Sequence, residues 1–117
     1  MVMLFDHKGQ VLLERRPATG IWGGLWGFPV CPTGWLPQDW IRKQFGLEIV
    51  SGVPWLPVHH EFTHLELEIH PVPAKLTKPA QVVESLDHVW YKPGLPLKRG
   101  VAAPILRLLQ QLEDYQL

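Results

Sequence analysis

The residues best suited to chemistry are the histidines and glutamates between positions 59 and 70. From His60 to His70 the sequence reads HEFTHLELEIH and contains H-E-x-x-H, the pattern with which zinc peptidases hold a metal ion. On a helix, His60 and His64 would lie one turn apart, about 6 Å along the axis, and both imidazoles would reach one zinc ion. In an extended strand the same interval spans about 13 Å, while each zinc–nitrogen bond measures about 2 Å. The chemistry therefore depends on which element this segment forms.

The residues after His64 favour a strand. Between residues 65 and 70, apolar and polar side chains alternate with period two, which is typical of a strand with one buried face. Leu67 also occupies the place where the longer zinc motif has a glycine. We therefore assign no metal to these histidines. We predict strands at 53–61 and 65–74, with a loop at 61–64 between them.

The other elements follow from periodicity and turn residues. A polar tetrad, Asp6 to Gly9, separates two apolar runs and predicts a β-hairpin. Pro37 and Gly46 bracket a short amphipathic segment, as the start and the stop of a helix. Pro71 and Pro73 place the strand after the histidine loop at a sheet edge. We predict further strands at 2–5, 11–16 and 89–91, and helices within 36–49 and 102–117.

This order of elements, β-β-α-β-β-β-α, predicts an α+β fold in which helices sandwich a mixed β-sheet. The 117 residues are enough for a single domain, residues 1–117, with one compact core. Six tryptophans and twelve prolines fit a loop-rich β fold with large aromatic anchors. Because the chain starts within a strand pattern, we expect it to be a fragment of a longer protein.

Charge and cysteine content exclude several classes of protein. Eleven basic and eleven acidic residues give no net charge, which argues against a domain that holds nucleic acid by charge alone. The single cysteine, Cys31, excludes an internal disulfide and a cysteine-ligated zinc or iron–sulfur site within this chain. It favours a reducing, cytosolic location. No apolar run approaches the length needed to cross a membrane.

A glycine-rich segment with two tryptophans follows the first predicted hairpin. From Arg16 to Val30 it reads RPATGIWGGLWGFPV. Its glycines permit backbone bends, and we expect Trp22 and Trp26 to fill the space around them as core residues. Arg15 and Arg16 are expected to anchor the segment by stacking on an indole.

Three stretches of the sequence carry a family resemblance. They are VLLERRPATGIWGGLWGFP at 11–29, HHEFTHLELEIHPV at 59–72 and VAAPILRLLQQL at 101–112. Together they resemble the C-terminal domain of the adenine DNA glycosylases of the MutY type, and the second is similar to that family's H-x-F-[ST]-H loop. The resemblance covers nearly the whole chain in the expected order. It implies the fold of the Nudix hydrolases such as MutT.

The implied fold raises the question of hydrolase activity. A working Nudix box, G-x5-E-x7-R-E-U-x-E-E-x-G-U, holds magnesium against a diphosphate with glutamates on one helix face. With Gly46-Leu47 aligned to its last two positions, Asp39-Trp40 replaces R-E and Lys43-Gln44 replaces E-E. Gly27 lies two residues too close, and the segment from there to position 39 contains no glutamate. We therefore expect a degenerate Nudix box that hydrolyses no nucleoside diphosphate.

The resemblance implies recognition rather than catalysis. In this family the domain helps the enzyme to find 8-oxoguanine paired with adenine, while an N-terminal helix-hairpin-helix domain with a 4Fe-4S cluster excises the adenine. We expect no catalytic residue, metal or cofactor within this chain. The implied partners are duplex DNA containing 8-oxoguanine:adenine and the N-terminal catalytic domain of the same protein. We expect a monomeric domain in the bacterial cytoplasm, associated with the nucleoid.

The residues expected to read the lesion are Phe62, Thr63 and His64, with His60 beside them. Oxidation at C8 turns N7 of guanine into an N–H donor and adds a carbonyl acceptor, so a reader needs groups that donate and accept. The Thr63 hydroxyl and the backbone amides of Thr63 and His64 meet this need, and Phe62 is placed to wedge or stack beside the pair. Many family members have serine at the position of Thr63. Compared with that serine, Thr63 keeps the hydroxyl and adds a methyl group close to the base. His60 and His64 are assigned to phosphate or loop-ordering contacts.

Other interpretations of the sequence stay open. Phe62 and Thr63 also suit a core aromatic and an ordinary loop residue. One alternative interpretation is an active Nudix hydrolase that acts on oxidised nucleoside triphosphates. Another is a protein-interaction module that binds its partner through exposed tryptophan and proline segments. Scattered basic residues offer phosphate contacts, although we expect most of them to be solvated surface. These are Arg15, Arg16, Lys75, Lys78, Lys92, Lys98 and Arg99.

Overall fold

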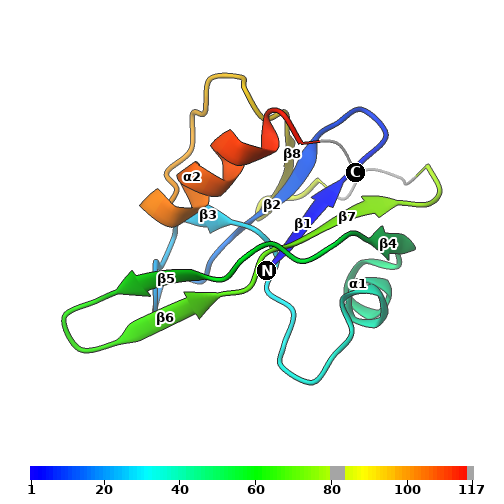
Figure 1. The fold of residues 1–117 in the computed structure, drawn as a ribbon. Coiled ribbons are helices and arrows are strands. Elements are labelled where there is room, and N and C mark those ends of the chain that lie inside the picture. Colours follow the sequence, from blue (N-terminus) through cyan, green and yellow to red (C-terminus); the bar gives the residue numbers. More distant parts are fainter. Residues whose placement is uncertain (80–83, 116–117) are drawn as a thin grey trace.

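The computed structural model describes residues 1–79 and 84–115 as a mixed β-sheet flanked by two helices, with a separate β-hairpin (Figure 1). The last two positions of the predicted C-terminal helix segment, 116 and 117, lie outside the described residues. In chain order the elements are β1 (Val2–Phe5), β2 (Val11–Arg15), β3 (Trp26–Gly27), α1 (Pro37–Phe45), β4 (Ile49–Ser51), β5 (Val58–Glu61), β6 (Glu66–Ile69), β7 (Val72–Leu76), β8 (His88–Tyr91) and α2 (Ala103–Leu112).

The main sheet is ordered β3-β2-β1-β7-β4, and β8 also pairs with β2. Strands β1 and β7 run parallel, from Val2↔Val72 to Phe5↔Lys75, whereas the other pairs of the sheet are antiparallel. Strands β5 and β6 form the separate hairpin, which projects away from the sheet (Figure 1). The predicted α+β fold, with helices against a mixed sheet, is confirmed.

Alternation along β1 and β2 sends side chains into two hydrophobic cores, one on each face of the sheet. Met3 and Leu13 point into the core beneath α2, while Leu4 and Leu12 point into the core beneath α1. The apolar face predicted for the C-terminal helix is buried in the first of these cores, so that prediction is confirmed. It consists of Ile105, Leu108, Leu109 and Leu112.

Helix α1 begins and ends where the sequence predicts. Pro37 lies in its first turn, and Gly46 follows its last residue with φ of 67°, the left-handed conformation that glycine adopts without steric cost. The N–H of Gly46 donates to the carbonyl of Arg42 at 2.9 Å and closes the last turn. Trp40 and Ile41 are buried against the sheet. No described helix is both long and apolar enough to cross a bilayer.

Two predicted strands are wrong in extent. The run at 53–61 contributes only β5 at its end, because Pro54 and Pro57 lack the N–H groups that a longer ladder requires. A strand that the sequence analysis did not assign, β4, lies earlier in the chain. The run at 65–74 is divided into β6 and β7 at His70 and Pro71, so that one half joins the hairpin and the other joins the main sheet.

The predicted edge position of Pro73 is also wrong, because β7 lies between β1 and β4. On the β1 side, the N–H of Val72 donates to the carbonyl of Met1 at 2.9 Å. The nitrogen of Pro73 faces the β4 side, just beyond Ser51, where β4 ends. The Pro73 carbonyl still accepts the N–H of Gly52 at 2.7 Å. A proline is therefore tolerated in a central strand, because the donor it lacks falls where the neighbouring strand has already ended.

Replacement of a sheet residue that faces the α2 core is expected to destabilise the fold strongly. Leu13 is fully buried, so Leu13→Ala should lower the free energy of unfolding by about 2–5 kcal/mol through lost burial and a residual cavity. The matched control, Leu56→Ala, removes the same atoms from a side chain that is 87% exposed and should change it by less than about 0.5 kcal/mol. Urea denaturation followed by tryptophan fluorescence measures both values, and equal losses would contradict the described core.

Candidate functional site

The candidate site is built on the tip of the β5–β6 hairpin. The two strands pair antiparallel from Val58↔Ile69 to Glu61↔Glu66. Beyond that pair, the N–H of Phe62 donates to the carbonyl of Leu65 at 2.6 Å, which makes Thr63 and His64 the central residues of the turn. Both central residues are exposed. The loop predicted at 61–64 is thus a turn at 62–65, and its hydroxyl and backbone amides are presented to solvent.

Three aromatic rings support this tip from one side. The ring of Trp22 lies 5.5 Å from that of His60 and 5.8 Å from that of Phe62, and the rings of His60 and Phe62 lie 4.8 Å apart. We call these residues the aromatic cluster. Tilted and edge-on contacts at such distances are favourable beyond simple burial. Phe62 is half-buried in this cluster rather than in either hydrophobic core, and His60 is half-buried beside it.

Trp22 reaches the hairpin because of the unusual backbone of the glycine-rich segment. Its φ is 53°, in the left-handed region that non-glycine residues rarely adopt. A Cβ atom at the next residue, Gly23, would collide with the carbonyl oxygen of Ala18, so only glycine fits there. The N–H of Gly24 lies 3.2 Å from the carbonyl of Arg16 and closes the segment on itself. The bends that the sequence predicts therefore serve to present Trp22 to the hairpin.

The two faces of the hairpin differ in polarity. The inner face carries Leu67 and Ile69 toward the core beneath α2, as the alternation predicts. On the outer face, the ring of His59 lies 3.3 Å from Glu66 and 3.8 Å from Glu68, with His70 3.6 Å from Glu68. All four side chains are about half exposed or more, so these contacts contribute little to stability.

The histidines of the H-E-x-x-H pattern do not converge on a common point. His60 lies in β5 and packs on Trp22, whereas His64 lies in the exposed turn. Over residues 1–79 and 84–115, no three histidine, cysteine, aspartate or glutamate side chains are grouped as metal ligands. The geometry that a zinc peptidase obtains from a helix is thus not produced by this strand and turn.

Trp26 lies at the margin of the sheet between two arginines. The Arg15 guanidinium lies 5.7 Å from the centre of the Trp26 ring, and that of Arg99 lies 5.1 Å from it. The predicted stacking of Arg15 on an indole is confirmed, and Arg16 secures the same segment by donating from Nε to the carbonyl of Ile21 at 3.0 Å. Trp22 and Trp26 are partly rather than fully buried, so they border the core that they were predicted to fill.

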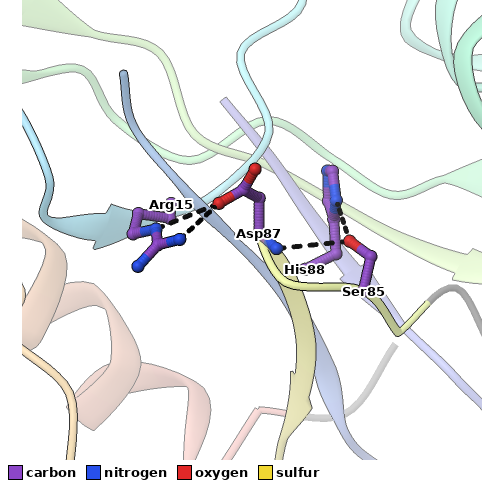
Figure 2. Close-up of polar contacts among 4 residues, drawn as sticks. All are labelled: Arg15, Ser85, Asp87 and His88. Atoms are coloured by element: carbon purple, nitrogen blue, oxygen red, sulfur yellow. Dashed lines mark hydrogen bonds and ion pairs between the residues drawn. The ribbon is translucent and has the colours of Figure 1, made fainter. Parts of the chain in front are cut away.

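The sequence analysis missed the partner of Arg15, which lies 72 positions away. Figure 2 shows Asp87 accepting from Nε and Nη2 of Arg15, at 3.0 and 2.8 Å. The turn that presents Asp87 is fastened by Ser85, whose Oγ lies 3.1 Å from Nδ1 of His88 and accepts the Asp87 N–H at 3.3 Å. Nε2 of His88 lies 3.1 Å from Glu14. The contacts of Ser85 close an exposed turn, and the contact of His88 with Glu14 joins paired residues of β8 and β2, so we assign them to stabilisation of the fold.

A cleft of about 410 Å³ separates the hairpin from the segment that leads into α1. The thiol of Cys31 lies in its wall, and burial raises the pKa of that thiol, partly offset by the N-terminal ammonium group. The thiol is therefore neutral and a poor nucleophile at neutral pH. The lining residues are Met1, Val2, Arg16, Ile21, Trp22, Val30, Cys31, Pro32, Thr33, Gly34, Trp35, Pro37, Leu67, Glu68, Ile69, His70 and Val72.

The residues near this cleft do not fit a magnesium–diphosphate site. Among the described residues that line the cleft, Glu68 is the one carboxylate, while a magnesium ion bound to phosphates takes its protein ligands from carboxylates. Helix α1 contributes Asp39 in its first turn but Arg42 and Lys43 in its last. The Lys43 ammonium lies 5.0 Å from the Trp35 ring, where positive charge opposes a cation.

The mixed sheet between two helices, with α1 at the position of the Nudix box, defines a Nudix-type domain. The chain belongs to the NUDIX domain family, which it matches over residues 1–111. It is also 23% identical over 113 residues to the adenine DNA glycosylase of Buchnera aphidicola subsp. Baizongia pistaciae. That match covers 97% of this chain and 32% of the relative, so the chain spans about a third of the length of that protein. The resemblance that the sequence analysis stated, to a Nudix-like domain of adenine DNA glycosylases, is confirmed by these two matches.

Solved structures share the fold at low sequence identity. The Nudix hydrolase RenU from M. smegmatis aligns with a TM-score of 0.64 at 16% identity, over 97% of this chain and 81% of that chain. The MutT protein from Methanosarcina mazei Go1 aligns with a TM-score of 0.61 at 18% identity, over 96% and 88%. The E. coli ORF135 protein gives 0.62 at 22%, over 97% and 89%. These likenesses show the fold alone.

Removal of the Trp22 ring is expected to loosen the hairpin tip. An isolated two-stranded hairpin is marginal in water, so Trp22→Ala should speed hydrogen exchange of the Phe62 amide, which closes the turn. The matched control is Trp35→Ala, which removes an indole that stands apart from the hairpin tip and stacks on Lys43. Exchange measured by NMR should increase about fivefold or more in the first variant, as expected for a lost aromatic contact of about 1 kcal/mol. Equal exchange in both would show that the cluster does not support the tip.

Proposed function

We propose that this domain recognises 8-oxoguanine paired with adenine in duplex DNA, as part of an adenine DNA glycosylase in base excision repair. The observation that carries the proposal is the exposed Thr63-His64 turn, raised on two strands and supported by the aromatic cluster. The similarity to a protein named adenine DNA glycosylase, which extends over 97% of the chain, supports it independently.

The chemistry of the turn suits the altered base edge. In guanine, N7 accepts a hydrogen bond and C8 carries no carbonyl group. In 8-oxoguanine, N7 instead donates a hydrogen bond and the new C8 carbonyl accepts one. The Thr63 hydroxyl both donates and accepts, and the amides of Thr63 and His64 add donors at the same point. Groups at an exposed turn approach a groove without deforming the sheets behind them.

Phe62 has a supporting part in this proposal. Its ring is half-buried between Trp22 and His60, so its position is set before DNA binds. A ring fixed in advance loses little conformational entropy when it stacks beside a base, which favours affinity. His64 is exposed at the tip and is assigned to a phosphate contact, while His60 is assigned to ordering of the loop.

The remaining two thirds of a protein such as the relative would perform the excision. We expect an N-terminal helix-hairpin-helix domain with a 4Fe-4S cluster to remove the adenine, with this domain as its lesion reader. In this proposal the chain itself is non-catalytic. Its partners are duplex DNA that contains 8-oxoguanine paired with adenine, and the N-terminal catalytic domain of the same protein. The protein would act in the cytoplasm at the nucleoid.

Loss of the Thr63 hydroxyl should reduce discrimination between damaged and undamaged DNA. Fluorescence anisotropy of the 117-residue chain gives Kd for duplexes with 8-oxoguanine or guanine opposite adenine. Thr63→Ala should lower the ratio of the two affinities by about threefold to tenfold, the worth of one net hydrogen bond. Thr63→Ser, which keeps the hydroxyl, should leave the ratio within about twofold of wild type. A wild-type ratio of one, or an unchanged ratio in Thr63→Ala, would remove the turn from lesion recognition.

The NUDIX membership makes a magnesium-dependent hydrolase the second candidate, and the single carboxylate of α1 argues against it. With magnesium and 8-oxo-dGTP, the chain should release no pyrophosphate above the rate without protein, because α1 offers one carboxylate where the family's box has several. Release that disappears in Asp39→Asn would contradict this expectation. It would assign the domain to nucleotide hydrolysis instead.

A further inference from the structure

Two guanidinium groups, those of Arg15 and Arg99, lie over the ring of Trp26, beside the segment that carries the aromatic cluster. We call these two residues and their basic sequence neighbours, Arg16 and Lys98, the arginine surface. Contact with an indole face orients a guanidinium group while leaving its N–H groups available to another partner. Arg99 is exposed, so its N–H groups reach solvent in this orientation.

The two arginines on Trp26 differ in their charge surroundings. Asp87 accepts two hydrogen bonds from Arg15 and offsets its charge (Figure 2). Arg16 donates from Nε to a neutral carbonyl, that of Ile21, which leaves its charge intact. Arg16 is half-buried and lines the same cleft as Glu68, so within the described residues the exposed positive charge of the arginine surface is that of Arg99 and its neighbour Lys98.

Backbone hydrogen bonds hold the arginine surface and the hairpin tip in one unit. The N–H of Trp26 donates to the carbonyl of Gly100 at 2.9 Å, which fixes the residue after Arg99 against β3. The N–H of Leu25 donates to the carbonyl of Trp22 at 3.0 Å, and the Trp22 ring then contacts Phe62. The path from Arg99 to the turn thus passes through paired backbone and packed rings.

The outer face of the hairpin carries the opposite charge. Glu61, Glu66 and Glu68 are all exposed there. A polyanion is repelled from that face and attracted to the arginine surface, even though the chain as a whole has no net charge. The distribution of charge therefore favours the arginine surface over the outer face of the hairpin as the place where a nucleic-acid backbone binds.

We propose that Arg99, with Lys98 beside it, binds backbone phosphates of duplex DNA, so that the duplex lies over the arginine surface while its bases face the hairpin tip. The planar donors of a guanidinium match two phosphate oxygens, and such contacts fix the register of a protein on DNA without reading sequence. The placement of the lesion at the tip rests on the proposed function, whereas the phosphate contacts apply equally to undamaged DNA.

The test is the salt dependence of binding to an undamaged duplex. A duplex phosphate contact contributes about 0.9 to the slope of log Kobs against log salt concentration. Arg99→Ala should reduce the magnitude of that slope by about this amount and weaken binding at low salt. Lys43→Ala is the matched control, because it also removes one cation from an indole, that of Trp35, and lies on α1 beneath the other face of the sheet. It should leave the slope unchanged.

Several results would overturn the phosphate contact. They are an unchanged slope in Arg99→Ala, an equal change in Lys43→Ala, or no salt-dependent binding by the wild-type chain. Arg99→Gln, which keeps a side chain over Trp26 without the charge, should lose the same slope as Arg99→Ala. This second variant separates the loss of the charge from any disturbance of packing.

The experiments distinguish a failure of the proposed phosphate contact from a failure of the proposed lesion preference. Arg99→Ala should weaken binding to lesion and undamaged duplexes by the same factor, so the ratio of affinities stays at the wild-type value. Thr63→Ala should change that ratio and leave the salt slope intact. A changed ratio in Arg99→Ala would move Arg99 from backbone binding to lesion reading, and it would overturn the inference as stated.

Discussion

The packing of Trp22 against the β5–β6 hairpin is the contact on which the candidate site depends. The hairpin is a two-stranded sheet of its own, joined to the main fold through its inner apolar face and through the rings of the aromatic cluster. Such a hairpin has little stability alone, so its tip is only as well placed as these contacts allow. They depend in turn on Gly23, where no side chain fits. A backbone constraint in one segment therefore determines the position of a turn some forty residues later along the chain.

The domain combines a Nudix fold with a helix α1 that carries one carboxylate, Asp39, and two cationic residues. The fold rests on apolar alternation in β1, β2 and β7 and on the buried faces of two helices, and these features match the family. The metal chemistry of such enzymes rests on a few carboxylates exposed on one helix, and α1 instead carries Arg42 and Lys43. Exposed residues of this kind are exchanged at little cost to stability. The same scaffold is thus free to present another site on a different edge.

Much of the fold follows from local signals. The tetrad Asp6 to Gly9 marks a turn through its own backbone preferences. Pro37 and Gly46 mark the two ends of α1 in the same way, and the spacing of apolar residues in α2 predicts which face of that helix is buried. The hairpin turn around Thr63 was also predictable, because the alternation after it has period two. The extents of the middle strands were not predictable, since partner strands decide where a ladder continues. Pro73 is the clearest case, because its tolerance depends on where β4 ends.

The sequence by itself determined the fold class, the hairpin with its Phe62-Thr63-His64 tip, and the missing carboxylates of α1, because each depends on residue type and short-range spacing. Only the tertiary structure decided that Trp22 supports that tip, that Asp87 offsets Arg15, and that Arg99 lies on Trp26. These pairs lie tens of residues apart along the chain. Contacts between residues so distant in sequence arise from the path of the whole backbone, which no local pattern of side chains encodes.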